Sequence, residues 1–304
     1  MFDFVGKRFW FFFISILIAV PCILSLSIAG FKTGIDFRGG TAMTLSFEEE
    51  VSEEQLRNAF IELGYGNATI QRTGDGDYFV RMEFVDPAQN TKLLADLGNI
   101  LGPPLQKDQT SIDESLAART VWFSIIAVCV AALGILLYVT FAFRKMPKAY
   151  RWGICTILAL IHDIVVVAGV FSILGWTFGI EIDALFITGM LTVVGYSVHN
   201  TIVVFDRIRE NMLRSGDNFM TVVNNSILQT ITRSLNTSLT LLFVLFALFL
   251  IGGSTIKYFV LVLIVGGITG TFSSMFIAGQ LLVVWEYKEW YRFIPFYRRR
   301  QELS

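Results

Sequence analysis

Two histidines and their polar neighbours lie inside long apolar stretches of the sequence. His162 stands beside Asp163, and His199 is followed by Asn200 and Thr201. A charged side chain near the centre of a bilayer costs about 2.5–3.5 kcal/mol, so ionisable groups at that depth usually serve a function. Because imidazole titrates near neutral pH, these residues predict a relay that carries protons across a membrane.

Arg233 adds a fixed positive charge just before another apolar stretch, where it could stabilise a deprotonated neighbour. At about 1.5 Å per helical residue, Asp163 lies about 16 Å into its stretch and His199 about 10 Å from Asp206. We therefore expect Asp163 and His199 to meet at a similar depth. The same groups could instead serve as hydrogen-bonded contacts between helices.

Six stretches are long and apolar enough to position these residues inside a membrane. The 304-residue chain is 54% apolar, whereas soluble domains contain roughly 45–50%. A spanning helix needs about 20 mainly apolar residues. The stretches that meet this length cover 9–29, 121–143, 152–174, 182–205, 235–251 and 258–285. The sequence therefore predicts an α-helical polytopic membrane protein with six transmembrane helices.

Lysine and arginine are concentrated before the first span, between the second and third, and after the fourth and sixth. This bias predicts that both termini are cytoplasmic. The chain then comprises a cytoplasmic N-terminus with the first span (1–30), an extracytoplasmic domain (31–119), spans two to six (120–286) and a basic cytoplasmic tail (287–304).

The extracytoplasmic segment has the pattern of a small α+β domain. Residues 41–47 and 78–84 alternate as strands do, a capping box at 52–55 opens a helix that ends at Gly64, and a second helix follows at about 88–101. The β-α-β-β-α order predicts a ferredoxin-like fold.

Two further segments predict how the helices meet their surroundings. Residues 206–232 mix charged residues with apolar ones at helical spacing, which favours an amphipathic helix at the membrane surface; a solvated linker is the alternative. Gly266, Gly267 and Gly270 form a small-residue face in the sixth span. Such a face lets another helix approach closely, either from this chain or from a partner.

Several classes of function are not expected. Cys22, Cys129 and Cys155 lie in apolar runs and are odd in number, so we expect no disulfide framework, metal site or cofactor. Catalytic motifs of zinc proteases and α/β-hydrolases are absent from the sequence, so we do not expect an enzyme. The net charge of −1 provides no basic excess for nucleic acid.

The motifs of this chain resemble those of the SecF family. Residues 34–41, with Asp36, Phe37, Gly39 and Gly40, are similar to an Asp-Phe-x-Gly-Gly signature that SecD and SecF share. Residues 195–211 resemble the fourth-span motif of SecF nearly residue for residue; they include Gly195, Tyr196, Ser197, Asp206 and Arg207. Three further stretches are similar at the matching places: 160–163, 233–238 and 270–274.

The resemblance implies a fold, partners and a function. A family member is half of a twelve-helix unit of the RND superfamily and pairs with SecD beside the SecYEG channel in the bacterial cytoplasmic membrane. YidC- or YajC-type auxiliaries and the translocating preprotein are further implied partners. The pair uses the proton motive force to assist protein export. Arg233 matches the family's arginine before span five and is carried over as a charge partner of the relay.

One departure from the family bears on mechanism. Many SecF sequences have Asn-Asp where this chain has His199-Asn200, and the aspartate is the family's expected proton carrier. The amide of Asn200 does not titrate. Either His199 replaces it with Asp163 as partner, which we favour, or the titrating carboxylate lies in SecD, or another ion is used. A non-titrating scaffold for SecD and a stand-alone RND-like exporter remain alternative functions.

Overall fold

The computed structural model describes residues 2–73 and 76–290 and divides into two compact units. A helical unit contains the chain up to Lys32, Ala127–Ile180 and the chain from Leu185. A sheet unit contains Thr33–Ile126 and Glu181–Ala184. Most of the predicted basic tail, from residue 291 onward, lies outside the described residues.

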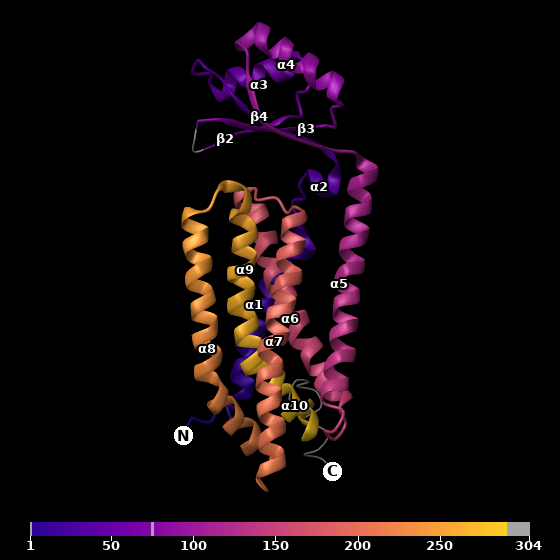
Figure 1. Cartoon of the computed structure of the whole chain (residues 1–304), viewed down its shortest axis with the longest axis vertical. Coiled ribbons are helices and arrows are strands. Elements are labelled where there is room, and N and C mark those ends of the chain that lie inside the picture. Colours follow the sequence, from indigo (N-terminus) through magenta and orange to yellow (C-terminus); the bar gives the residue numbers. More distant parts are fainter. Residues whose placement is uncertain (1, 74–75, 291–304) are drawn as a thin grey trace. The chain divides into compact units, whose positions relative to one another are not determined.

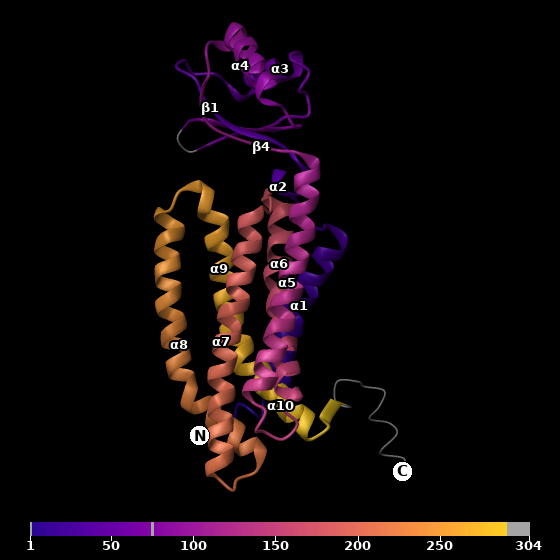
Figure 2. The ribbon, with the colours of Figure 1, turned by 45° about the vertical axis from the view of Figure 1, so that its right-hand side comes forward.

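Six helices in the described part of the chain are long and apolar enough to cross a membrane, as the sequence predicted. The first five are α1 (Arg8–Ile28), α5 (Glu114–Ala142), α6 (Tyr150–Phe178), α7 (Ala184–Arg214) and α8 (Phe219–Ile251). The sixth span, Ile256–Glu286, combines α9 (Ser254–Ser273), the π-helical turn η1 (Ser274–Ala278) and α10 (Gly279–Glu286). Figures 1 and 2 show α6, α7, α8 and α9 running side by side.

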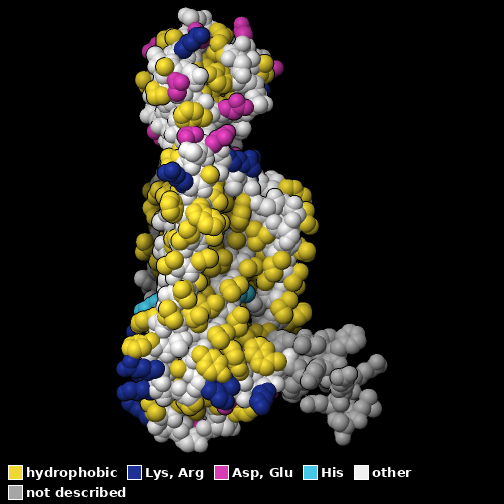
Figure 3. Space-filling model, turned by 90° about the vertical axis from the view of Figure 1, so that its right-hand side faces the viewer, with side chains coloured by type: hydrophobic (Ala, Val, Ile, Leu, Met, Phe, Trp, Pro, Cys, Tyr) yellow, Lys and Arg dark blue, Asp and Glu magenta, His cyan; other side chains and the backbone are white. Residues whose placement is uncertain are grey.

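Small residues bring the spans together. A Cβ atom at Gly169 of α6 would lie 2.1 Å from the Cβ of Cys22 on α1, and one at Gly189 of α7 would lie 2.8 Å from Val262 of α9. Helix α6 packs against both α1 and α9. The outward face of the helical unit is largely hydrophobic, and Lys and Arg side chains gather toward its lower end in Figure 3.

Residues 206–232 do not form a separate amphipathic helix. Helix α7 continues to Arg214, and α8 begins at Phe219 after the N-cap Asn218, whose side chain accepts from the Thr221 N–H at 2.9 Å. The segment is therefore a helical hairpin made of the ends of two spans. No proline interrupts 206–232, so the helical hydrogen bonds of α7 run on until the turn that contains Gly216.

The sheet unit contains a four-stranded antiparallel sheet in the order β2-β3-β1-β4. Its strands are β1 (Gly40–Ser46), β2 (Thr69–Arg72), β3 (Tyr78–Met82) and β4 (Leu105–Ile112). Its helices are the short α2 (Ile35–Arg38), α3 (Glu53–Glu62) and α4 (Pro87–Leu101). Helices α3 and α4 cover one face of the sheet (Figures 1 and 2), and their apolar sides meet the strands around Leu45, Leu56, Val80 and Leu97.

The helix starts in the sheet unit follow from local sequence. Ser52 and Gln55 form the predicted capping box at the start of α3, and Asp86 and Gln89 form another at the start of α4. Strand β4 was not predicted, because it is a largely exposed edge strand of mostly polar residues. Lys107 of β4 donates to both carboxylate oxygens of Asp77 at 2.7 and 2.8 Å and thereby lowers the pKa of Asp77.

Candidate functional site

Asp163 is fully buried in α6 and lies at the centre of a polar cluster between three spans. Its Oδ2 accepts from the Ser197 hydroxyl of α7 at 2.6 Å and from the Ser273 hydroxyl of α9 at 2.7 Å. Its Oδ1 lies 3.1 Å from Nδ1 of His162. A carboxylate in lipid thus has hydrogen-bond partners on both oxygens, which compensates part of the cost of its burial.

The close approach of α7 and α9 places the two serines. A Cβ atom at Gly270 would lie 3.0 Å from the Cβ of Ser197, and one at Gly266 would lie 2.1 Å from Val193. Gly267 faces Leu242 of α8 at an ordinary 3.7 Å. The three glycines predicted to form a packing face therefore contact two different helices of this chain.

A second group of hydroxyls adjoins the Asp163 site. Thr201 Oγ1 lies 2.9 Å from Ser274 Oγ. Both hydroxyls also reach the Ser197 carbonyl, at 3.0 and 2.9 Å, and Ser274 Oγ is 2.6 Å from the Gly270 carbonyl. Ser274 is the first residue of the π-helical turn η1. Such turns are frequent at functional sites.

A third chain of hydroxyls links α7, α8 and α9. Tyr196 Oη is 2.7 Å from Ser238 Oγ, which is 2.7 Å from Thr271 Oγ1. Ser238 and Thr271 are buried. Hydroxyl groups both donate and accept, so linked hydroxyls can reorient as the proton at one end changes place.

Two buried nitrogen atoms near the cluster lack a hydrogen-bond partner among the described residues. They are Nε2 of His162 and Nδ2 of Asn200. An unpartnered polar atom in a buried position is costly, so each marks a place where a further polar group would be favourable. Asn200 shares a face of α7 with Ser197, because three residues advance a helix by nearly one turn.

The structure does not bring His199 to Asp163, which corrects the expected pairing. His199 is exposed on α7, whereas Ser197 is buried against Asp163. Two residues advance an α-helix by about 200°, so the two side chains point in nearly opposite directions. Matching depth alone was therefore not enough to predict which residue faces Asp163.

Arg233 is likewise separated from the buried cluster. It is exposed on α8, and the ion pairs found among the described residues do not include it. Its neighbour Ser234 is the residue that turns inward. Asn236 is exposed on the same helix. The expected contact between Arg233 and a relay carboxylate is thus not formed within this chain.

The remaining signature residues occupy three places. Asp36, Phe37, Gly39 and Gly40 lie in α2 and the turn to β1. Gly195 is exposed on α7. Near the end of α7, Asp206 pairs with Arg209 at 2.9 Å, and Arg207 pairs with Glu210 at 2.5 Å and donates to Gln229 at 2.7 Å.

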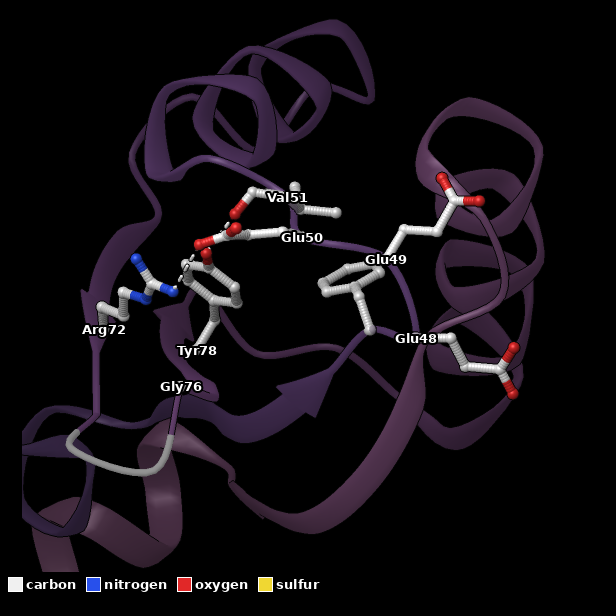
Figure 4. A pocket seen from close by; sticks show the side chains of 8 residues that line it. Glu48, Glu49, Glu50, Val51, Arg72, Gly76 and Tyr78 are labelled. Carbon is white, nitrogen blue, oxygen red and sulfur yellow. Dashed lines mark hydrogen bonds and ion pairs between the residues drawn. The ribbon is translucent and has the colours of Figure 1, made fainter.

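The sheet unit holds a separate open cavity of about 240 Å³. In Figure 4, Glu50 and Arg72 point toward one another, whereas Glu48 and Glu49 point away. The Glu50–Arg72 ion pair measures 3.2 Å and both side chains are more than half exposed. Among the described residues, no three His, Cys, Asp or Glu side chains gather as a metal site would require.

Ser273 is the residue that sequence analysis placed in the wrong role. It was grouped with the small residues of the sixth span, but its hydroxyl binds Asp163. The available signal was its place in the 270–274 motif, where a serine supplies both small volume and a donor.

Comparison with known proteins agrees with this architecture. Residues 99–288 match the family model "Protein export membrane protein SecD/SecF, C-terminal", and residues 24–51 match "SecD/SecF GG Motif". The chain is 44% identical to protein translocase subunit SecF of Thermobaculum terrenum, over 99% of this chain and 98% of that protein. It is 32% identical to SecDF of Bacillus subtilis over 94% of this chain but 38% of that longer protein.

A solved structure extends the likeness to the fold. The crystal structure of SecDF from Thermus thermophilus superposes with a TM-score of 0.80 at 32% identity, covering 94% of this chain and 39% of that one. The six spans and the small sheet unit thus define a multi-pass transport protein of the bacterial cytoplasmic membrane, not an enzyme. The chain belongs to the SecD/SecF family, as a SecF-type subunit of protein translocase.

Proposed function

We propose that this subunit uses the proton motive force to assist protein export, with Asp163 as the group that takes up and releases the proton. The observation that carries the proposal is the complete burial of Asp163 between three spans, with hydroxyl donors on one oxygen and His162 on the other. A carboxyl group retained at this depth is a functional candidate by default.

The Asp163–His162 pair can hold one proton in two places without changing its geometry. When Asp163 is ionised, the Nδ1–H of His162 donates to Oδ1; when Asp163 is protonated, its O–H donates to Nδ1 of the neutral ring. The free Nε2 of His162 is the next point of transfer. The neighbouring hydroxyls reorient to follow the charge.

The partner in this proposal is SecD, which is part of the same chain in the SecDF relatives. His199, Arg233 and Asn236 are exposed on the apolar spans α7 and α8. Polar groups facing lipid are costly, so a second membrane subunit covers them, and a SecD carboxylate pairs with Arg233. Asn200 then serves as a hydrogen-bond donor, not as a proton carrier.

The orientation follows the distribution of basic residues. Both termini lie in the cytoplasm and the sheet unit lies outside, where its movements act on the translocating preprotein emerging from SecYEG. YidC- or YajC-type auxiliaries bind the same assembly. Asp206 and Arg207, near the cytoplasmic end of α7, anchor that end at the lipid headgroups.

Export of a secreted reporter in cells that lack their own SecF tests the proposal. Asp163→Asn keeps the size and one carbonyl acceptor but cannot titrate. We expect export to fall to the level of cells without the subunit, while membrane abundance and co-purification with SecD stay unchanged. Asp217→Asn, an exposed change in the turn before α8, is the matched control and should retain full export.

Proton uptake provides a second measurement. Vesicles containing the Asp163→Asn variant with SecD should lose the proton flux that accompanies export. If export and flux both persist, the subunit is a non-titrating scaffold and the proton passes through SecD alone.

A further inference from the structure

The loop that precedes α7 is bound to the start of the sheet unit. The Gly34 N–H donates to the Ile182 carbonyl at 2.8 Å, and Thr33 forms a parallel β-bridge with Ile182. The Ala184 N–H donates to Oδ2 of Asp36 at 2.7 Å. All of these residues belong to the sheet unit, so the contacts lie within one compact body.

An ion pair ties the same loop to the middle of the sheet. Arg81 of β3 pairs with Glu181 at 2.7 Å, and the two side chains are only 24% and 14% exposed. Arg81 lies opposite Ala42 of the central strand β1. Because both side chains are largely shielded from water, this pair is screened less than a surface pair would be.

Gly39 and Gly40 determine where Asp36 lies. Their φ angles are +79° and +128°, and a Cβ at Gly40 would lie 2.6 Å from the Met82 carbonyl. A Cβ at Gly39 would lie 3.1 Å from the backbone of Glu114 at the start of α5. Residues with side chains fit this turn poorly, so the glycine pair lets α2, with Asp36, pack at the edge of the sheet.

Asp36 supplies an acceptor that α7 itself cannot provide. The first N–H groups of a helix lack intrahelical partners, and a carboxylate there also interacts favourably with the positive end of the helix dipole. Ala184 is the first residue of α7, and the same helix carries Ser197 about 20 Å further along.

We propose that Asp36 is a positioning residue that couples the sheet unit to α7, so that displacement of the sheet is carried along α7 to the Asp163 site. The inference rests on the proposed function for its consequence in export. The physical link itself does not depend on that function, and it can be tested separately.

Amide hydrogen exchange of the complex with SecD tests the link. Asp36→Ala should raise the exchange rate of residues 184–187 about fivefold, the effect of losing one helix cap of ordinary strength. Asp36→Asn, which keeps an oxygen acceptor, should raise it less. The control Asp86→Ala removes the cap of α4 inside the same unit and should leave 184–187 unchanged. Unchanged exchange in Asp36→Ala overturns the link.

Export with a covalent tether tests the coupling. Thr33 and Ile182 are parallel bridge partners, and neighbouring strands lie about 4.8 Å apart, within disulfide range. Asp36→Ala should reduce export at least fivefold, the lower end of usual coupling effects. Adding Thr33→Cys and Ile182→Cys should restore export when oxidised and lose it on reduction. Undiminished export in Asp36→Ala, or no recovery with the tether, overturns the coupling.

The two proposals fail in distinguishable ways. If Asp163→Asn retains export, the proton function fails while hydrogen exchange still decides whether Asp36 holds α7. If Asp163→Asn abolishes export and Asp36→Ala does not, the coupling through Asp36 fails alone.

Discussion

At the scale of single residues, the site depends on which side of each helix a polar group occupies. Ser197 and Asn200 are buried, and His199 between them is exposed. Asp163 therefore gains two serine donors, and its imidazole partner is His162, which is adjacent in sequence. The two histidines have different surroundings despite their similar sequence context.

The two histidines provide a matched residue-scale prediction. We expect His162→Gln to lower export to the level without the subunit, because glutamine cannot exchange a proton with Asp163. His199→Gln should retain most export, because His199 does not contact Asp163 and glutamine keeps its hydrogen-bonding capacity. Reporter export at equal membrane abundance measures both. Equal loss in the two variants would contradict the assignment.

At the scale of elements, α7 and α9 pack closely enough that their contact decides whether the serines reach Asp163. Gly270 lies against Ser197, and Gly266 lies against Val193. The π-helical turn that follows Ser273 adds one residue to a helical turn and shifts the face presented by the rest of the sixth span. Small volume and helix geometry therefore determine the site as much as the polar groups do.

Adjacent glycines test this packing. Gly266→Ala forces a Cβ to within 2.1 Å of Val193 and should destabilise the protein by about 1–3 kcal/mol, as overpacked cores do. Gly267→Ala meets Leu242 at an ordinary 3.7 Å and should change stability by less. Thermal unfolding of the purified protein in detergent compares the two. A larger loss in Gly267→Ala would show that the α7–α9 contact is not the tight one.

At the scale of the whole molecule, the helical unit carries polar groups on surfaces that its own helices do not cover. Arg233 and Asn236 are exposed on α8, and His199 is exposed on α7. The relatives of the SecDF type contain more than twice the length that this chain matches. Together these features support a partner that covers the polar surface inside the membrane.

Co-purification with SecD tests that surface. Asn236→Leu removes an exposed polar group from α8 and should reduce the recovered SecD, since hydrogen bonds between membrane helices contribute about 0.6–2 kcal/mol. Ser27→Leu makes a similar change on the exposed face of α1, where the hydroxyl bonds only its own helix at the Ile23 carbonyl. Equal recovery of SecD with both variants would place the partner elsewhere.

The sequence by itself determined the elements of this protein. Long apolar stretches predicted the six spans, because lipid requires every backbone group to be paired within the helix. The capping box at Ser52 and Gln55 predicted the start of α3. Strand β4 escaped prediction, since a mostly polar edge strand pairs through its backbone and carries little side-chain signal.

Only the tertiary structure decided which residues meet. Sequence analysis chose the buried carboxyl, Asp163, but paired it with His199, whereas helix rotation and the small residues of α9 bring Ser197 and Ser273 to it instead. The contact of Asp36 with Ala184 spans 148 residues of sequence and leaves no local pattern. Local physics thus defines the helices and strands, while contacts between distant segments depend on packing that no single segment encodes.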